Sequence, residues 1–352
     1  MSKGATEIPN LRIGDLALQA LRSARRGCLM ASTTSGVFLE LDTGLILALL
    51  AGGTPLHPWA VSGILPVQWE ELRALTPSRT KTNILAPRSR TKASPNVTFE
   101  VTPVALKGPG VELIYAKAVV VGLRMPRWGP SMEGSDSSQE APTPTEVRPA
   151  KTHKRAPLRA TLRKLVSTHS RQASHKSGAV QASDHALLVA ATTLQAEVSK
   201  AAPSGSELLG AGSLRDALHM IRTQGDPRPL AALLGGGEGL TPAADDVILG
   251  VLAACEMLSD FEPTVRRFRQ ELVAQMPTPL RQYTTRFSAQ LIEAAIAGHF
   301  PEPLLDIAHA ICAPQFSEAQ LVEATKRLLA VGHSSGLLWL SGFSEIFSTS
   351  LR

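Results

Sequence analysis

The fold of this 352-residue chain is decided by the stretch Gly235–Leu258, GGGEGLTPAADDVILGVLAACEML, in which a glycine-rich loop leads into an apolar helix. Thr241 is a suitable N-cap residue, because its hydroxyl can accept a free backbone N–H one turn into a helix. Pro242 suits the first helical position, and the dipole favours Asp245 and Asp246 in the first turn. Capping and dipole together contribute about 1–2 kcal/mol, so we expect a helix that begins at Thr241.

The glycines before this helix need a further reason. Four glycines within five positions, Gly235, Gly236, Gly237 and Gly239, lose much backbone entropy on folding, and a simple connection needs only one. A glycine loop that runs into a helix N-terminus presents several N–H groups to an anion, so a carboxylate or phosphate is the expected guest. The pattern is neither a Walker A loop, which ends in Gly-Lys-Ser/Thr, nor a Rossmann fingerprint, which follows a strand.

The two adjacent carboxylates are expected to do different things. Neighbouring helical residues point about 100° apart, so one aspartate should face the site while the other supports the backbone. Such a pair can hold an amide N–H, move a proton or bind Mg²⁺. We expect no tightly bound cofactor and no dedicated metal site, although the carboxylates leave Mg²⁺ open as an alternative.

A second turn resembles the first, because it also places glycine and hydroxyl residues just before an apolar helix. VGHSSGLLWLSG, residues 331–342, ends one helix at Gly332 and offers Ser334 and Ser335 as caps for the next, with His333 beside them. If this turn meets the glycine loop, two helix N-termini converge on one anion. Arg286, in YTTRFSAQ, is the expected cation for a carboxylate or phosphate, with an exposed helical arginine as the alternative.

Working outward, helical patterns separated by Gly or Pro fill the chain from about residue 181 to the end. Short β-branched and alternating runs precede residue 125 and predict a small sheet or barrel. We therefore expect an α+β protein with a β-rich domain over 1–125, a flexible insertion over 126–180 and an α-helical domain over 181–352.

The charge distribution argues against nucleic acid as a partner. Nine Lys and Arg and no acid lie between residues 147 and 176, and removing them from the total leaves 36 − 9 = 27 bases against 30 acids. The basic character therefore belongs to the expected insertion, which has no aromatic residues between its bases for stacking. No apolar run of about 18 residues and no secretory leader is evident, and the three cysteines are widely spaced. We expect a cytoplasmic protein without a membrane span.

The chain resembles the oxamate carbamoyltransferase AllH-type subunit family in three stretches that follow one another in this order. They are GEGLTPAADD, the Thr-Arg helix that ends in AIAGHF, and LLAVGHSSGLLWLSG. The family's glycine motif reads roughly Gly-Leu-Thr-Pro-Ser-Gly-Asp-Asp, and Ala243 and Ala244 replace the Ser-Gly pair here. Leu338 takes the place of an acidic residue in the second motif. The resemblance covers the C-terminal half best.

The resemblance implies a subunit of an enzyme of allantoin and purine nitrogen catabolism, which exchanges oxalurate and phosphate for oxamate and carbamoyl phosphate. Its partners would be these small anions and the other carbamoyltransferase subunits. A non-catalytic anion-binding, assembly or regulatory subunit is the alternative. We expect the catalytic groups to be Asp246 and His333. The expected substrate-binding residues are Gly236, Gly237, Gly239, Thr241, Asp245, Arg286, Ser334, Ser335 and Gly336.

Overall fold

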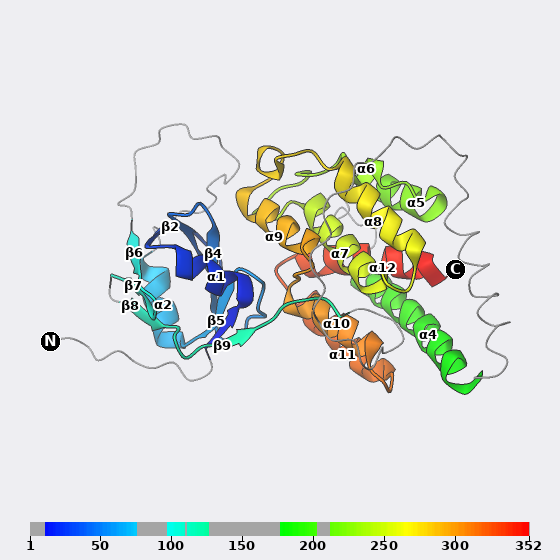
Figure 1. The fold of residues 1–352 in the computed structure, drawn as a ribbon, viewed down its shortest axis with the longest axis horizontal. Coiled ribbons are helices and arrows are strands. Elements are labelled where there is room, and N and C mark those ends of the chain that lie inside the picture. The colour runs from blue at the N-terminus through cyan, green and yellow to red at the C-terminus, as the bar shows by residue number, and fades with distance from the viewer. Residues whose placement is uncertain (1–10, 76–96, 110, 127–176, 203–211, 352) are drawn as a thin grey trace, which may run out of the picture.

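The computed structural model describes residues 11–75, 97–109, 111–126, 177–202 and 212–351. A curled β-sheet at the N-terminal end packs beside a C-terminal group of helices, which confirms the expected α+β class (Figure 1). The expected flexible insertion lies outside the described residues over 127–176. Helix α4 begins at Ser177, inside the range assigned to that insertion.

The sheet has nine strands in the order β8-β7-β6-β2-β3-β4-β5-β1-β9. Neighbouring strands are antiparallel except for the parallel pairs β4–β5 and β1–β9. The elements of this region are β1 (Arg12–Gly14), α1 (Asp15–Ser23), β2 (Arg26–Ser32), β3 (Gly36–Leu41), β4 (Ile46–Ala51), β5 (Ala60–Ile64), α2 (Pro66–Ala74), β6 (Thr98–Val101), β7 (Ala105–Gly108), β8 (Val111–Ile114) and β9 (Val119–Val121).

The central strands are buried on both faces, which explains their continuous apolar runs in the sequence. In β4, Leu47 and Leu49 pack into one core together with residues of α1 and α2. The alternate residues Ile46, Ala48 and Leu50 pack into a second core that continues into the helices. The sheet and the helical region therefore share one of the two hydrophobic cores.

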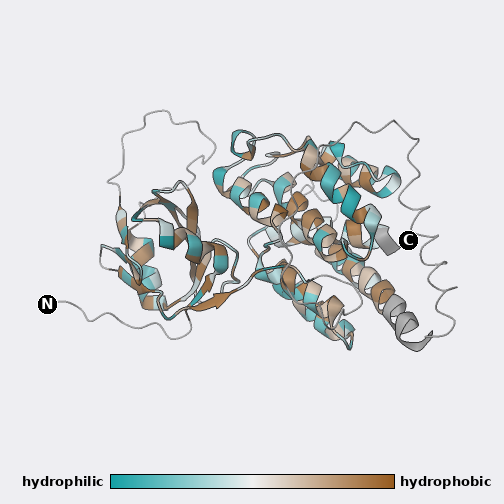
Figure 2. Ribbon diagram, in the orientation of Figure 1, coloured by the Kyte–Doolittle hydropathy of each residue, from teal (hydrophilic) through white to brown (hydrophobic). Residues whose placement is uncertain are grey.

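The helical region is arranged around α7, whose side chains are buried from Ala244 to Leu258. Apart from Asp245, Asp246 and Glu256, α7 is apolar on all sides, as is typical of a helix at the centre of a domain, and Figure 2 shows apolar residues along it. The elements are α4 (Ser177–Ala201), α5 (Ser213–Gln224), α6 (Arg228–Ala231), α7 (Ala243–Leu258), α8 (Pro263–Gln275), η2 (Leu280–Gln282), α9 (Arg286–Ile296), α10 (Glu302–Cys312), α11 (Glu318–Leu329) and α12 (Ser335–Leu351).

Helices α7 and α12 run side by side in the same direction at close approach. A Cβ added to Gly250 would lie 2.0 Å from the carbonyl oxygen of Trp339, and one added to Gly342 would lie 2.2 Å from that of Val247. The backbones can meet this closely only because both positions lack a side chain. The crossing places the N-terminal ends of the two helices next to each other.

A set of polar contacts, which we call the sheet–helix junction, joins the two regions. The Gln290 side-chain amide exchanges two hydrogen bonds of 2.8 Å with the backbone of Ile46 at the start of β4. Glu302 binds the Arg12 guanidinium through both oxygens and accepts the N–H of Leu56. Because these groups pair across the boundary, the junction helps to fix how the helices sit against the sheet. Among the described residues, no helix is long and apolar enough to span a membrane.

Candidate functional site

The glycine-rich loop folds back on the start of α7. Two of its amides are used internally: Gly235 donates to a carboxylate oxygen of Asp245 at 2.6 Å, and Gly236 donates to the carbonyl of Leu233. Gly237 has φ +119°, and a Cβ there would lie 2.6 Å from the backbone nitrogen of Ala243. At least part of the glycine content therefore has a structural cause. Residues 237–239 are exposed, and no described residue accepts a hydrogen bond from their amides.

Asp245 is the aspartate that supports the backbone. It is 1% exposed and accepts hydrogen bonds from Gly235, from Ser288 at 2.6 Å and from Thr284. Burial raises the pKa of this carboxyl, and the three donors oppose the rise. Because its hydrogen bonds join the loop to the first turn of α9, Asp245 ties two elements together and does not face solvent.

Asp246 is also buried, at 2% exposure, but its partners are different. It accepts from Trp339 Nε1 at 2.8 Å, from the Thr241 hydroxyl at 3.2 Å and from the Ser335 hydroxyl. Burial raises its pKa from 3.8 to about 7, while the three donors lower it and the charge of Asp245 adds to the rise. Asp246 is therefore a buried carboxyl that titrates near neutral pH and connects two helices.

The expected capping by Thr241 is wrong. Helix α7 begins at Ala243, Pro242 occupies the cap position in an extended conformation, and no side chain caps the helix. The extended proline sets Thr241 one residue too far from the first turn, so its hydroxyl turns to Asp246 instead. The amides at the start of α7 therefore lack the side-chain cap that the sequence indicated.

Three helix N-termini meet at this place, which we call the glycine mouth: the loop Gly235–Pro242 with Thr285 and Ser335. The hydroxyls of Thr241 and Ser335 lie 3.3 Å apart, so the turn before α12 does meet the loop before α7. The hydroxyl of Thr285, the N-cap of α9, donates to the carbonyl of Leu240 at 2.6 Å. The N-terminal ends of three helices, with the positive ends of their dipoles, therefore lie close together beside the exposed loop residues 237–239.

Other expected site residues lie elsewhere or are oriented differently. The Arg286 guanidinium pairs with Glu40 at 2.9 Å and donates to the carbonyl of Gly44, so it belongs to the contact between α9 and the sheet. Gly336 is buried, and a Cβ there would lie 2.0 Å from the Leu328 carbonyl, which makes it a packing position against α11. His333 is exposed and Ser334 half-buried in the turn before Ser335.

The part of the chain that forms this site is also the part that is similar to a known protein family. Residues 233–346 match the family model described as oxamate carbamoyltransferase subunit AllH. The match confirms the resemblance seen in the sequence. It begins two residues before the first glycine of the mouth and ends within α12, so the whole glycine mouth lies inside the AllH region. No solved structure matches the chain.

Sequence reasoning missed three polar residues of the AllH region that hold the two aspartates: Trp339, Thr284 and Ser288. Trp339 lies one helical turn after Ser335 and shares its face of α12, whereas Thr284 lies just before the N-cap Thr285 of α9 and Ser288 lies in its first turn. The four-residue spacing of Ser335 and Trp339 could have indicated from the sequence that both contact the same group. Among the described residues, no group of three or more His, Cys, Asp or Glu forms a candidate metal cluster.

Proposed function

We propose that this chain is a subunit of an oxamate carbamoyltransferase and that its glycine mouth binds the anionic end of a small substrate. The observation that carries the proposal is the Asp246 network. A buried carboxyl links the Thr241 and Ser335 hydroxyls next to the exposed loop residues 237–239, within the region that matches the AllH family. Amides and helix dipoles suit a carboxylate or phosphate.

The substrates have a second group that the network suits. When Asp246 is ionised, the hydroxyls of Thr241 and Ser335 donate their hydrogens inward to it, which leaves lone pairs toward the mouth. Hydroxyl oxygens in this state accept N–H groups such as the NH₂ of a carbamoyl group. Oxalurate, oxamate and carbamoyl phosphate each combine an anionic end with an amide-type nitrogen. We propose that the glycine mouth binds both groups of such a molecule.

The proposed reaction follows from that binding mode. A phosphate oxygen bonds to the carbamoyl carbon of oxalurate, the bond from that carbon to the oxamate nitrogen breaks, and the nitrogen takes up a proton. Amides of residues 237–239 are proposed to stabilise the oxyanion that forms on the way. We propose Asp246 as the group that positions the hydroxyls and His333, exposed in the turn before Ser335, as the proton donor.

A cytoplasmic location and the presence of other carbamoyltransferase subunits are part of the proposal. The three cysteines are unpaired thiols, as is usual in reducing compartments. The family description names a subunit, so we expect the complete activity only with the partner subunits present.

A regulatory or assembly subunit is the second candidate, and two observations favour it. Arg286 is committed to Glu40, so it does not supply a cation to the mouth. Ala243 and Leu338 stand where the resembling family has a hydroxyl and an acidic residue, and Leu338 is buried. A subunit of this kind would bind the anion without taking part in the transfer.

The test combines binding and turnover. The chain would be mixed with the other carbamoyltransferase subunits, and carbamoyl phosphate formed from oxalurate and phosphate would be measured for wild type and Ser335→Ala. Calorimetry with phosphate and oxamate would report binding by the same proteins. Ser341→Ala is the matched control, because its hydroxyl lies on the same helix but donates to the Leu337 carbonyl.

Each result points to one reading. Loss of both binding and turnover in Ser335→Ala, with Ser341→Ala unchanged, supports the enzyme subunit. Loss of binding with turnover retained at saturating substrate indicates the regulatory subunit. Unchanged binding of both anions in Ser335→Ala contradicts an anion site at the glycine mouth.

A further inference from the structure

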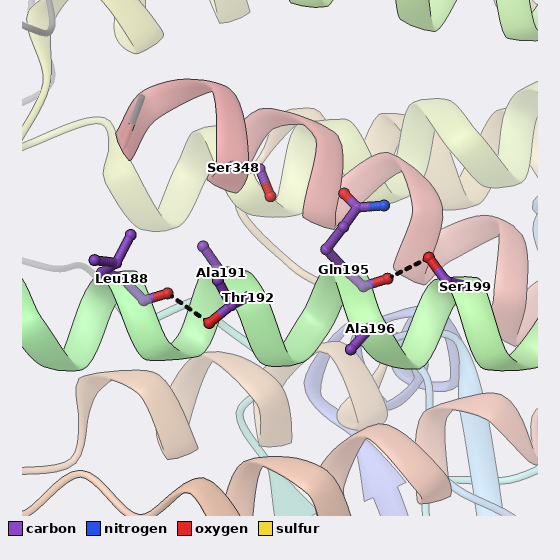
Figure 3. Close-up of a pocket in the computed structure, with 7 residues that line it drawn as sticks. All are labelled: Leu188, Ala191, Thr192, Gln195, Ala196, Ser199 and Ser348. Carbon is purple, nitrogen blue, oxygen red and sulfur yellow. Dashed lines mark hydrogen bonds between the residues drawn. The ribbon is translucent and has the colours of Figure 1, made fainter.

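A second candidate site lies away from the glycine mouth, between α4 and the C-terminal end of α12. A groove of about 210 Å³ lies there, and Figure 3 shows the residues that line it. Six of its lining residues come from α4 and one from α12: Leu188, Ala191, Thr192, Gln195, Ala196, Ser199 and Ser348. None of them carries a formal charge.

Ser348 distinguishes the groove from ordinary helix packing. Its residue is 8% exposed, and its hydroxyl oxygen is buried without a hydrogen-bond partner among the described residues. The other buried hydroxyls nearby on α12 are satisfied, because Ser341, Ser344 and Thr349 donate to carbonyls three or four residues earlier. Figure 3 shows the Ser348 hydroxyl directed toward α4. A buried hydroxyl without a partner is unfavourable in an empty groove and favourable in an occupied one.

The remaining polar groups of the groove define what would bind. The hydroxyls of Thr192 and Ser199 donate to carbonyls of α4 itself, which leaves only their lone pairs available. The Gln195 side chain extends from α4 toward α12 and carries both a donor and an acceptor (Figure 3). Leu188, Ala191 and Ala196 add apolar surface to the lining.

We propose that this groove binds a small uncharged molecule that carries both N–H donors and a carbonyl acceptor, such as a primary amide. One N–H group would meet the lone pair of Thr192 or that of Ser199, which lie about 10 Å apart along α4, and the carbonyl would accept from Ser348. Among the described residues, the lining offers no cation to an anion and no carboxylate to an ammonium group. A volume of about seven times the 30 Å³ share of a liquid water molecule suits a ligand of about five to ten non-hydrogen atoms.

The experiment uses the full chain with isotope-labelled alanine and leucine methyl groups, so that Leu188, Ala191 and Ala196 report on the groove by NMR. Propionamide is the probe, and propionate is the charged molecule of the same shape. Propionamide should shift these methyl signals saturably, with a Kd on the order of 10 mM for a molecule of this size. Propionate should leave them in place.

Ser348→Ala should weaken propionamide binding by about three- to tenfold, because one hydrogen bond is lost. Without ligand, Ser348→Ala should unfold at the same temperature as wild type or higher, since the hydroxyl it removes has no partner. Ser344→Ala is the matched control: its hydroxyl is bonded within α12, so this variant should lower the unfolding temperature and leave binding unchanged.

The proposal is overturned if propionamide causes no saturable shift, if propionate shifts the same signals equally, or if Ser348→Ala binds propionamide as wild type does. A lower unfolding temperature in Ser348→Ala would show that the hydroxyl has a structural role in the free protein. None of these results depends on the glycine mouth, so the carbamoyltransferase proposal stands or falls separately.

Discussion

The sheet–helix junction and the glycine mouth both bury polar groups, but they end their hydrogen-bond networks differently. At the junction, Gln290 pairs with the backbone of Ile46, and both partners are buried. At the mouth, Asp246 is equally buried, yet its hydroxyl partners Thr241 and Ser335 are half exposed. A closed network, whose members are all buried, can only stabilise the fold. In a network that reaches the surface, the charge of the buried carboxyl can change how the exposed hydroxyls bind a ligand.

The largest expected effect tests the closed network. Gln290→Ala removes both hydrogen bonds to Ile46 and leaves a buried N–H and C=O without partners. We expect a loss of about 2–4 kcal/mol in the free energy of unfolding, measured by urea denaturation. Gln320→Ala, at an exposed position of α11, is the matched control and should change stability by less than about 0.5 kcal/mol. A loss below about 1 kcal/mol for Gln290→Ala would show that water replaces the amide and that the junction is not closed.

The next effect concerns Asp246 and pH. Its pKa is about 7 in the folded protein against 3.8 as the unperturbed value, so the folded state binds the extra proton between these limits. The contribution of this group to stability is present at low pH and is lost as pH rises toward 7. Relative to Asp246→Asn, which does not titrate, wild type should therefore lose about 2–3 kcal/mol of unfolding free energy between pH 5 and pH 8. Parallel denaturation curves of the two proteins across this range would contradict the burial of an ionisable Asp246.

Much of this arrangement was predictable from the sequence, and the exceptions have physical causes. The spacing of apolar residues, and the Gly and Pro residues that end helices, indicated the α+β class and the helix after the glycines, because both are local features of the sequence. Helix geometry predicted that Asp245 and Asp246 point in different directions, and their hydrogen-bond partners do differ. The pairing of Arg286 with Glu40 depends on a contact between residues far apart in the sequence, so no local pattern indicates it. The ring of Pro242 fixes its φ but not its ψ, so the sequence did not show that the helix begins one residue later.

A pair of serines compares the two kinds of network within one region. Ser288 is 2% exposed and donates to Asp245, so Ser288→Ala should lower the free energy of unfolding by about 1–2 kcal/mol. Ser335 is half exposed, so water can replace its hydroxyl and Ser335→Ala should lower stability by less than about 1 kcal/mol. Thermal unfolding with and without phosphate would measure both effects.

The two variants should also differ in their response to phosphate, and here the larger change should be in Ser335→Ala. Phosphate should still raise the unfolding temperature of Ser288→Ala but not that of Ser335→Ala, because only Ser335 lies at the mouth. If phosphate stabilises both variants equally, Ser335 plays a structural part like that of Ser288, and the distinction between the two networks fails.

The smallest effect concerns Arg286, which the sequence suggested as the cation of the site. Its guanidinium is paired with Glu40, and both side chains are more than 30% exposed. Exposed ion pairs of this kind contribute about 0–1 kcal/mol, so Arg286→Gln should lose less than about 1 kcal/mol of unfolding free energy. Calorimetric titration with phosphate should give the same affinity as wild type at matched ionic strength. A clear fall in affinity would mean that Arg286 leaves Glu40 when the anion binds, and the mouth would then include a cation drawn from the junction.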